Sequence, residues 1–387
     1  MERKVISDRK KRLGSVSGLL LVWLLTSIGT CKMPSPVVLQ ESLAGQKAKN
    51  VILIIGDGMG LSQISAALYS NNNKLSLEQF PVIGFQKTHS SDDLITDSAA
   101  SATAFACGVK TYNGAIGVNA DTVPCQTILE LLDTKGYATG MVVTSTIVHA
   151  TPAAFIAHRP MRVQYEDIAL DFLDTEIDLM IGGGKRYFDR RDNDERDLYQ
   201  ELVQKGYAVS DYSAELLEDI RINSKQNFVY FTADKHPITA AAGRDYLPFA
   251  TEKALDFLER HSEKGFFLMI EGSQIDWGGH SNDANILIEE ALDLNKAIKL
   301  VYQFASKRDD TLVIVTADHE TGGTAINPDS KMGKLNLAFT TNGHTASMVP
   351  VFAFGPSAYL FSGIYDNTEI YHKMLQALDM EHHLSAR

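Results

Sequence analysis

The sequence is poor in cysteine, in positive charge and in long apolar runs, and each shortage excludes a class of protein. Its three cysteines do not have the spacing of a zinc finger. The formal net charge of -12 argues against a nucleic-acid-binding protein, which would normally be basic. The same charge fits an acidic soluble surface or a site that gathers carboxylates around cations. No internal repeat or low-complexity linker divides the chain.

The first thirty residues are typical of an export signal. A cluster of basic residues at 9–12 precedes an apolar run, Leu19 to Ile28, that is too short to span a membrane comfortably. We therefore expect residues 1–30 to be a signal peptide and residues 31–387 to be an exported protein, periplasmic or extracellular. Cys31 follows Ile28-Gly29-Thr30, which resembles a loose lipobox, so a lipid anchor at Cys31 is the alternative to simple export.

The other two cysteines leave two interpretations open. In an oxidising compartment Cys107 and Cys125 could form a disulfide, and buried free thiols fit the sequence equally well.

Apolar, β-branched runs alternate with amphipathic stretches of helical period. This alternation predicts an α/β fold, a three-layer αβα sandwich whose central mixed β-sheet is mostly parallel and covered on both faces. The expected strands are Val51–Ile55, Met141–Thr144, Asp178–Ile181, Phe228–Phe231, Phe266–Ile270, Leu312–Val315 and Val351–Phe354. The expected helices are Thr127–Leu132, Tyr165–Leu173, Phe249–Glu259 and Ala284–Phe304.

Three of the expected strands carry an acidic residue at the same relative place. Asp57 follows the first strand within Gly-Asp-Gly-Met-Gly, Glu271 ends another, and Asp318 ends a third. A single Asp after a strand is usually a turn former or a helix cap. Because ligands bind beyond the carboxyl ends of strands in open α/β sheets, three such ends favour one shared site.

Residues 96–104, Thr-Asp-Ser-Ala-Ala-Ser-Ala-Thr-Ala, predict a helix of small residues with Ser98 at its N-terminus. A helix N-terminus favours an anion. A serine hydroxyl is a poor nucleophile until a base or a metal lowers its pKa, and no Ser-His-Asp pattern surrounds Ser98 in the sequence. Ser98 therefore needs an activator from elsewhere in the chain.

Histidines and carboxylates with metal-ligand spacing supply candidates. Asp276 and His280 are four residues apart, so on a helical turn they face the same side, as zinc ligands or as a simple hydrogen-bonded pair. Asp318 and His319 are adjacent, which suits ligands on a loop beyond a strand and also suits an ordinary turn. His344, within Gly-His-Thr, is weak evidence alone.

In order along the chain, these motifs resemble the alkaline phosphatase family. The resemblance runs from about Val51 to Gly355. It rests on Gly-Asp-Gly-Met-Gly (56–60), Thr-Asp-Ser-Ala-Ala-Ser-Ala-Thr-Ala (96–104), His-Ala-Thr-Pro-Ala (149–153), Glu-Gly-Ser-Gln-Ile-Asp (271–276), Thr-Ala-Asp-His-Glu (316–320) and Gly-His-Thr (343–345).

The resemblance implies hydrolysis of phosphate monoesters through a covalent phosphoserine at Ser98, activated by zinc instead of a base. It implies two Zn²⁺ and one Mg²⁺ per chain. The ligand sets it implies are Asp276, His280 and His344 for one zinc, Asp57, Asp318 and His319 for the second, and Asp57, Thr151 and Glu271 for magnesium. Relatives are commonly homodimers, so the resemblance also implies a homodimer.

The resemblance further implies an arginine that holds the phosphate oxygens bidentately. Arg162 has the matching distance from Ala157-His158, and Arg159 is the competitor. Asp97 would orient that arginine or, alternatively, would only cap the helix of Ser98.

This chain departs from other family members at two positions and in one segment. His149 stands where some bacterial members carry Asp, which weakens the case for tight Mg²⁺ binding. Trp277 stands where some members carry Lys and animal members carry His, so we expect weaker product binding and faster release. Residues 321–343 replace the large crown insertion of other members, so we expect an open site with broad monoester specificity.

Two other functions fit parts of the pattern. A phosphodiesterase or phosphonate hydrolase shares the bimetallic frame but often uses threonine as nucleophile, which Ser98 disfavours. A non-catalytic metal- or phosphate-binding protein is disfavoured by the retention of nucleophile, arginine and ligands. A sulfatase would need a Cys-x-Pro-x-Arg context, and the sequence has none.

Overall fold

The computed structural model describes residues 35, 37, 40, 43 and 45–380, all within the unit Ser35–Arg387. The expected signal peptide (residues 1–30) and Cys31 lie outside the described residues. Within the described part of the chain, no helix is long and apolar enough to cross a membrane.

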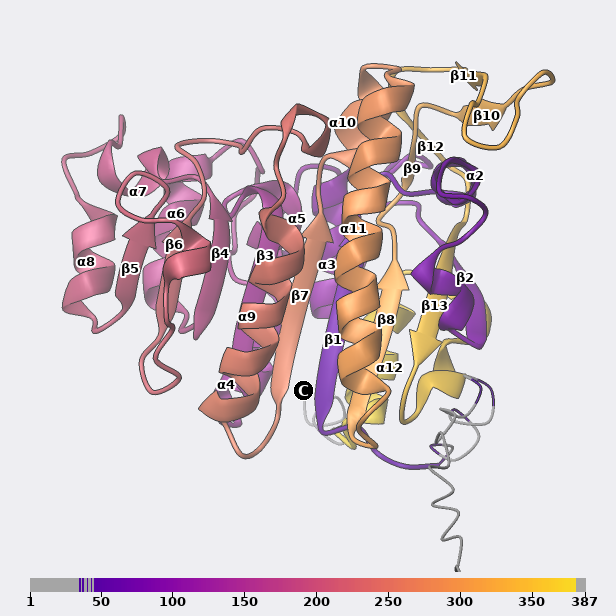
Figure 1. The fold of residues 1–387 in the computed structure, drawn as a ribbon. Helices are drawn as coiled ribbons and strands as arrows, with labels where there is room; N and C mark the ends of the chain where they lie inside the picture. Colours follow the sequence, from indigo (N-terminus) through magenta and orange to yellow (C-terminus); the bar gives the residue numbers. More distant parts are fainter. Residues whose placement is uncertain (1–34, 36, 38–39, 41–42, 44, 381–387) are drawn as a thin grey trace, which may run out of the picture. The chain divides into compact units, whose positions relative to one another are not determined.

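A ten-stranded sheet forms the centre of this unit (Figure 1). Its strand order is β14-β2-β13-β8-β1-β7-β3-β4-β6-β5. All neighbouring strands are parallel except that β13 runs antiparallel to β8 and β2. The strands are β1 (Asn50–Gly56), β2 (Val82–Lys87), β3 (Ala138–Thr146), β4 (Leu179–Gly183), β5 (Ala208–Asp211), β6 (Phe228–Phe231), β7 (Phe266–Gly272), β8 (Thr311–Thr316), β13 (Val349–Phe354) and β14 (Gly363–Asp366).

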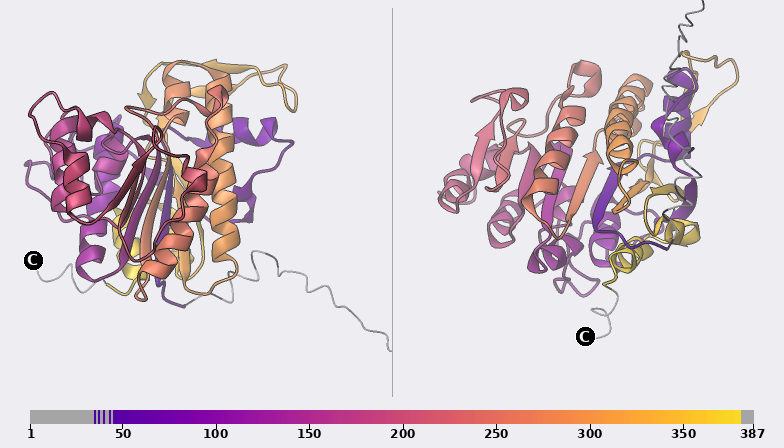
Figure 2. Two further views of the ribbon diagram at one scale, coloured as in Figure 1. Left: turned by 60° about the vertical axis from the view of Figure 1, so that its left-hand side comes forward. Right: turned by 60° about the horizontal axis from the view of Figure 1, so that its bottom comes forward.

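Helices cover both faces of the sheet, as the two turned views show (Figure 2). The α-helices are α2 (Leu61–Ser70), α3 (Ser98–Cys107), α4 (Ile128–Thr134), α5 (Ala150–Ala153), α6 (Tyr165–Asp174), α7 (Arg186–Asp189), α8 (Leu198–Gln204), α9 (Tyr246–His261), α10 (Ile275–His280), α11 (Ala284–Ala305) and α12 (Glu369–Ala377). Short 3₁₀ turns are η1 (Ser76–Gln79), η2 (Leu217–Asp219), η3 (Ala240–Ala242) and η4 (Ala358–Phe361).

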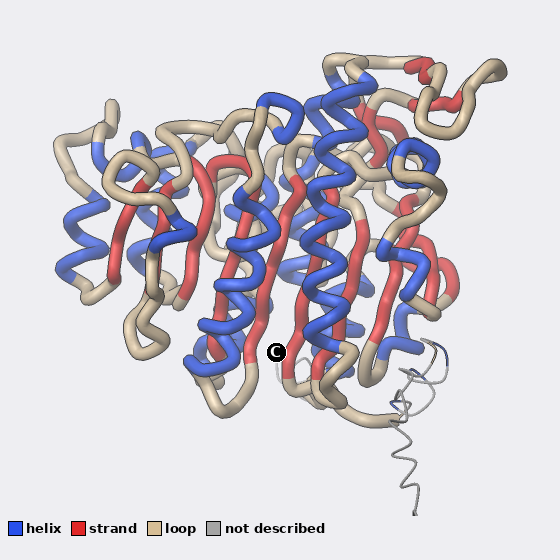
Figure 3. The backbone as a smooth tube through the Cα atoms, viewed as in Figure 1, coloured by secondary structure: helices blue, strands red, loops and turns tan. Residues whose placement is uncertain are grey.

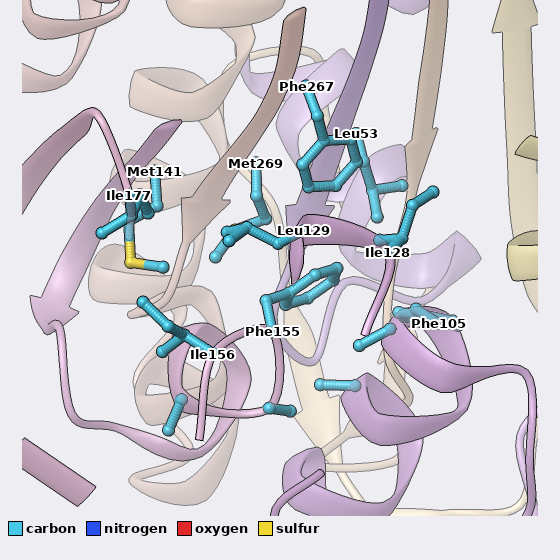
Figure 4. Packing of buried hydrophobic residues seen from close by; sticks show 14 of the residues in the cluster. Leu53, Phe105, Ile128, Leu129, Met141, Phe155, Ile156, Ile177, Phe267 and Met269 are labelled. Atoms are coloured by element: carbon cyan, nitrogen blue, oxygen red, sulfur yellow. The ribbon is translucent and has the colours of Figure 1, made fainter. Parts of the chain in front are cut away.

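Alternate residues of β1 point into two separate cores, which explains the three layers. Leu53 packs with residues of α3, α4, α6 and α12 on one face, whereas Ile52 and Ile54 pack with residues of α2, α9 and α11 on the other. Successive side chains of a strand point to opposite faces, so a strand buried on both sides must be apolar throughout. Figure 4 shows Leu53 and Phe267 above Phe155 and Phe105 in the first of these cores.

The predicted fold class is confirmed. Every expected strand and helix is present, with bounds that differ by a few residues. The prediction lacked three strands of the large sheet, β2, β5 and β14, which lie at or next to its edges (Figure 3). Their sequences are short and mixed, such as Gly-Ile-Tyr-Asp for β14, so they lack the apolar run that marks a central strand.

The short crown predicted at 321–343 forms small strands outside the large sheet. A hairpin pairs β10 (Thr324–Ile326) with β11 (Leu337–Phe339), and β9 (Glu320–Thr321) pairs with β12 (His344–Thr345). The hairpin lies beyond the carboxyl ends of the central strands, near α2 (Figure 1), where the Gly333 amide donates to the Tyr69 carbonyl at 2.9 Å.

Candidate metal centre and nucleophile

The sheet register brings the three strand-end carboxylates together. β1 lies between β7 and β8, with Ile55 opposite both Glu271 and Thr316, so Asp57, Glu271 and Asp318 emerge at the same edge. All three side chains are fully buried. The sheet therefore concentrates negative charge in a dry site.

Gly58 allows the chain to turn after Asp57. Its φ of 69° is in the left-handed region, and a Cβ at this position would lie 2.8 Å from the Asp276 Cα. A glycine is therefore needed both for the turn and for the close approach of α10, which carries Asp276.

Helix α3 presents Ser98 to these carboxylates. Asp97 is its N-cap and accepts from the Ala100 amide at 3.0 Å, so Ser98 is the first helical residue. All ten residues of α3 are buried, which explains the run of small side chains. Ser101, one turn later, donates to the Asp318 carbonyl at 2.8 Å and fixes the helix against the end of β8.

Ser98 Oγ lies 3.3 Å from His319 Nε2, an arrangement that differs from a catalytic triad. In a triad the carboxylate binds the ring nitrogen that faces away from the serine. Here the same Nε2 also lies 3.1 Å from Asp318 Oδ2 and 3.6 Å from Asp57 Oδ1. One nitrogen, two carboxylates and a serine oxygen converge on one point, which is the geometry of a shared cation rather than of a base.

A second convergence involves Asp276, His280 and His344. Asp276 lies 3.2 Å from His280 Nε2 and 3.5 Å from His344 Nε2, and the two Nε2 atoms are 3.1 Å apart. Each ring directs its Nδ1 to a backbone carbonyl, Asn342 for His280 and Thr96 for His344. Because Nδ1 faces a carbonyl and must donate, the neutral form of each ring carries its lone pair on Nε2, which faces inward, as metal ligation requires.

A third group gathers around Glu271. Asp57, His149 and Glu271 each offer one ligand atom within 4.8 Å of the others. Thr151 lies beside Glu271 and its Oγ1 has no well-formed hydrogen bond within the described residues. The sequence placed Thr151 here and gave His149 only an outer role, whereas the structure brings a ring nitrogen of His149 within 4.8 Å of carboxylate oxygens of Asp57 and Glu271.

Buried oxygens without partners show that these groups fit cations. Among the described residues, both oxygens of Asp57, Oε1 of Glu271 and Oδ2 of Asp318 make no well-formed hydrogen bond. Buried polar atoms are almost always satisfied, so such a cluster indicates ligands for an ion. The oxygen and imidazole donors suit Zn²⁺, and the oxygen atoms of Asp57, Thr151 and Glu271 also suit Mg²⁺.

The pKa values of Asp57 and Glu271 are raised, because both carboxylates are buried near other negative charges. Burial, followed by Asp318 and Asp276, raises the pKa of Asp57 well above its ordinary range. Burial raises the pKa of Glu271 to about 7 against hydrogen bonds from Ser273. Although burial opposes the shift, neighbouring histidines hold the pKa values of Asp276 and Asp318 below the ordinary range. For Asp57 and Glu271, bound cations would supply the positive charge that ionisation requires.

Arg162, and not Arg159, pairs with Asp97, the residue that precedes Ser98. Arg162 Nη1 donates to Asp97 Oδ2 at 2.9 Å, so Asp97 both caps α3 and orients the arginine. Arg159 instead pairs with Asp171 on α6, with Nε to Oδ2 at 2.9 Å. The two roles that the sequence offered for Asp97 therefore coexist, one on each carboxylate oxygen.

The sequence missed the supporting residues of the site. His236 stacks edge-on against Trp277 at 4.8 Å and His149 at 5.5 Å between ring centroids. Ser273 and Ser145 donate to Glu271 Oε2 at 2.6 and 3.4 Å. A lone histidine and scattered serines carry no spacing signal, so only the fold could reveal them.

The comparisons with known proteins show the family of this chain. A family model described as "Alkaline phosphatase" matches residues 48–338 and 327–380. Alkaline phosphatase 3 of Bacillus subtilis (strain 168) is 34% identical over 454 residues, covering 93% of this chain and 96% of the relative. Alkaline phosphatase of Escherichia coli (strain K12) is 31% identical over 418 residues, covering 89% and 88%.

Solved structures give the same result. Alkaline phosphatase from the Antarctic bacterium TAB5 is 42% identical with a TM-score of 0.82, covering 87% of this chain and 99% of that one. A histidine-to-aspartate variant of the TAB5 enzyme, with magnesium in the site called M3, is also similar, at 42% identity and a TM-score of 0.81 over 86% of this chain and 99% of the variant. The chain belongs to the alkaline phosphatase family and is a metal-dependent hydrolase of phosphate monoesters.

Proposed function

We propose that Ser98 is the nucleophile and that hydrolysis passes through a covalent phosphoserine. The observation that carries this proposal is the convergence on Ser98 Oγ of a histidine nitrogen that two carboxylates share. Ser98 Oγ loses its proton and forms a bond to phosphorus. The bond between phosphorus and the ester oxygen breaks, and that oxygen leaves with the electron pair and takes up a proton to give the alcohol. Water then attacks the phosphoserine, and inorganic phosphate leaves with Ser98 restored.

Arg162 holds two non-bridging phosphate oxygens during both steps. Its guanidinium is planar and always charged, and Asp97 fixes one edge of it at 2.9 Å. Although burial disfavours its charge, Asp97 keeps the pKa of Arg162 above its ordinary value. The phosphoryl group therefore meets a pre-oriented cation at the N-terminus of α3.

Three cation sites fit the residues present. We propose one zinc set of Asp276, His280 and His344, a second of Asp57, Asp318 and His319, and a third site of Asp57, Thr151 and Glu271. When bound, such ions lower the pKa of a nearby hydroxyl and neutralise the charge on attacking and leaving oxygens.

His149 decides which ion the third site holds. Burial, and the charge of Arg162, hold the pKa of His149 at about 3, so the ring is neutral and adds no charge to balance a hydrated Mg²⁺. The magnesium-bound structure of the TAB5 enzyme carries Asp in place of a histidine, which supports this interpretation. We propose that His149→Asp raises magnesium content per chain, whereas unchanged magnesium content would contradict this role.

The substrate specificity is broad for phosphate monoesters, because the crown at residues 321–343 is short. Trp277, in contact with His236, places an uncharged ring at the position where some family members carry a lysine. We therefore expect inorganic phosphate, the product, to be held more weakly. A product-inhibition constant as tight as that of lysine-bearing relatives would contradict this.

The predicted signal peptide supports export to the periplasm or the exterior, with a catalytic domain over residues 31–387 and a lipid at Cys31 as the alternative. A homodimer is the assembly we propose, by analogy with the family. Sedimentation of the purified chain and mass spectrometry of its N-terminus test these two points.

The test of the mechanism is hydrolysis of an aryl phosphate monoester beside the matching diester at alkaline pH, with and without a chelator. We expect chelator-sensitive monoester turnover that exceeds diester turnover. Ser98→Ala should lose turnover and fail to retain phosphate after acid quench. Ser65→Ala is the matched control, because the Ser65 hydroxyl donates to the Leu61 carbonyl of its own helix, at 2.8 Å. Full activity in Ser98→Ala would refute the covalent mechanism.

A further inference from the structure

The two cysteines within the described residues lie together at the far end of the nucleophile helix. Cys107 is the last residue of α3, and Cys125 lies in the segment that precedes α4. Cys107 Sγ donates to the Cys125 carbonyl at 3.5 Å, and the two thiols are within hydrogen-bonding reach of each other. Both are free thiols in this structure.

An imidazolium lies beside the pair. His158 directs Nδ1 to the Gly117 carbonyl at 2.7 Å and Nε2 to Glu130 Oε1 at 2.8 Å. Both partners are acceptors, so both ring nitrogens must carry protons and the ring is a cation. Although burial lowers it, these hydrogen bonds raise the pKa of His158 to about 9.

The two thiols differ in their surroundings. The pKa of Cys125 is lowered, chiefly by its hydrogen bond with Cys107 and further by the positive charge of His158. Burial and the negative charge of Glu130 oppose this shift without cancelling it. Burial raises the pKa of Cys107 well above its ordinary value. Cys125 is therefore the better nucleophile, and Cys107 is its protected neighbour.

Cys125 is also the accessible member. It is partly exposed and, with His158 and Glu130, lines a cavity of about 450 Å³. Cys107 is 7% exposed. A small disulfide reagent can therefore reach Cys125 first.

We propose that Cys107 and Cys125 are a reversible dithiol–disulfide pair in which Cys125 attacks and Cys107 resolves. The oxidant is a low-molecular-weight disulfide. The Cys125 thiolate attacks one of its sulfurs, forms a mixed disulfide and releases one thiolate. Cys107 then loses its proton and attacks Cys125 Sγ, which forms the Cys107–Cys125 bond and releases the second thiol. The reagent is reduced to two thiols, and the two cysteines are oxidised by two electrons.

The disulfide would restrict the segment between the two cysteines, which makes hydrogen bonds to Asp97 and Arg162. The segment between the two cysteines includes Asn113, whose Oδ1 accepts from the Asp97 amide at 2.9 Å, and Gly114, whose carbonyl accepts from the Arg162 amide at 2.7 Å. Closing a loop of this length restricts the unfolded chain, and we expect the disulfide to raise Tm by about 4 °C.

The experiment uses the full chain with its metals. The chain carries Cys31→Ser, so that Cys107 and Cys125 are the two cysteines left to react. Oxidised glutathione should produce a Cys107–Cys125 disulfide, found by peptide mapping, that dithiothreitol reverses. Cys107→Ser should accumulate the glutathione adduct at Cys125, and Cys125→Ser should react at least tenfold more slowly at Cys107. His158→Gln, combined with Cys107→Ser, should slow adduct formation several-fold near neutral pH, because it removes the positive charge and keeps a hydrogen-bond donor.

Three results would overturn the proposal. The first is failure of the wild-type protein to form the disulfide under conditions in which Cys107→Ser is fully modified by glutathione. In that case the wild type either keeps both thiols or carries a glutathione adduct that Cys107 does not resolve. The second is equal reactivity of Cys107 and Cys125 in the single variants. The third is a Tm that oxidation leaves unchanged in the wild type or shifts equally in Cys107→Ser.

Discussion

Asp97 has two separable roles, and two substitutions distinguish them. One oxygen caps α3 at the Ala100 amide, and the other holds Arg162. Asn caps a helix about as well as Asp but carries no charge, whereas Ala can neither cap nor pair. Asp97→Asn therefore tests the pair alone, and Asp97→Ala tests the pair and the cap together.

The expected stability losses follow from these contacts. Losing a hydrogen bond to a charged, half-buried arginine costs about 1.5 kcal/mol in both variants. Losing the cap costs about 1 kcal/mol more in Asp97→Ala. For a folded unit of this length 1 kcal/mol corresponds to roughly 1.4 °C, so Tm should fall by about 2 °C in Asp97→Asn and by about 3.5 °C in Asp97→Ala.

Activity should respond differently from stability. Freeing one edge of Arg162 removes its fixed orientation toward phosphate, and we expect kcat/KM to fall about tenfold in both variants, equivalent to about 1.4 kcal/mol. Steady-state kinetics on an aryl phosphate and calorimetry on the metal-loaded protein measure the two effects. Wild-type kcat/KM in Asp97→Asn would refute the orienting role. Equal Tm values for the two variants would refute the cap.

Three further outcomes are expected. Gly278→Ala should lower Tm and zinc content per chain, because a Cβ at this position would lie 2.5 Å from the Leu287 amide nitrogen and push α10 away; unchanged zinc would count against that packing. His158, with a folded pKa of about 9 against an ordinary 6.5, stabilises the fold fully below about pH 6.5 and loses this contribution as the pH rises to 9. The decline in Tm over that range should shrink in His158→Gln, and an identical pH profile would contradict the shift. Exhaustive chelation should abolish turnover and lower Tm, with both restored by Zn²⁺; a Tm insensitive to chelator would argue against cations that neutralise the buried carboxylates.

The sequence predicted the elements that carry a periodic or compositional signal. Buried parallel strands must be apolar on both faces, so the run at residues 51–55 marks β1 without any tertiary information. The strands β2, β5 and β14, at or next to the edges of the sheet, were not predicted because their residues mix polar and apolar types and show no single pattern. The spacing of Asp276 and His280 is also a local signal, because residues four apart lie on the same side of a helical turn.

Contacts between distant segments were beyond the sequence. Nothing local indicates that His236 packs against Trp277, that Ser273 supports Glu271, or that His319 presents one nitrogen to Ser98 and two carboxylates together. Such contacts depend on strand order and helix docking, which many residues decide jointly.

The sequence by itself determined the α/β class, the strand-end acids and the serine at a helix start, because each follows from side-chain periodicity or short-range spacing. The tertiary structure decided which groups share a site: it separated Arg162 from Arg159, joined both roles of Asp97, and brought Cys107 beside Cys125. The reason is physical. Local preferences act over a few residues, whereas a site is set by the parallel register of β8, β1 and β7 and by the packing of α3 and α10 against their ends.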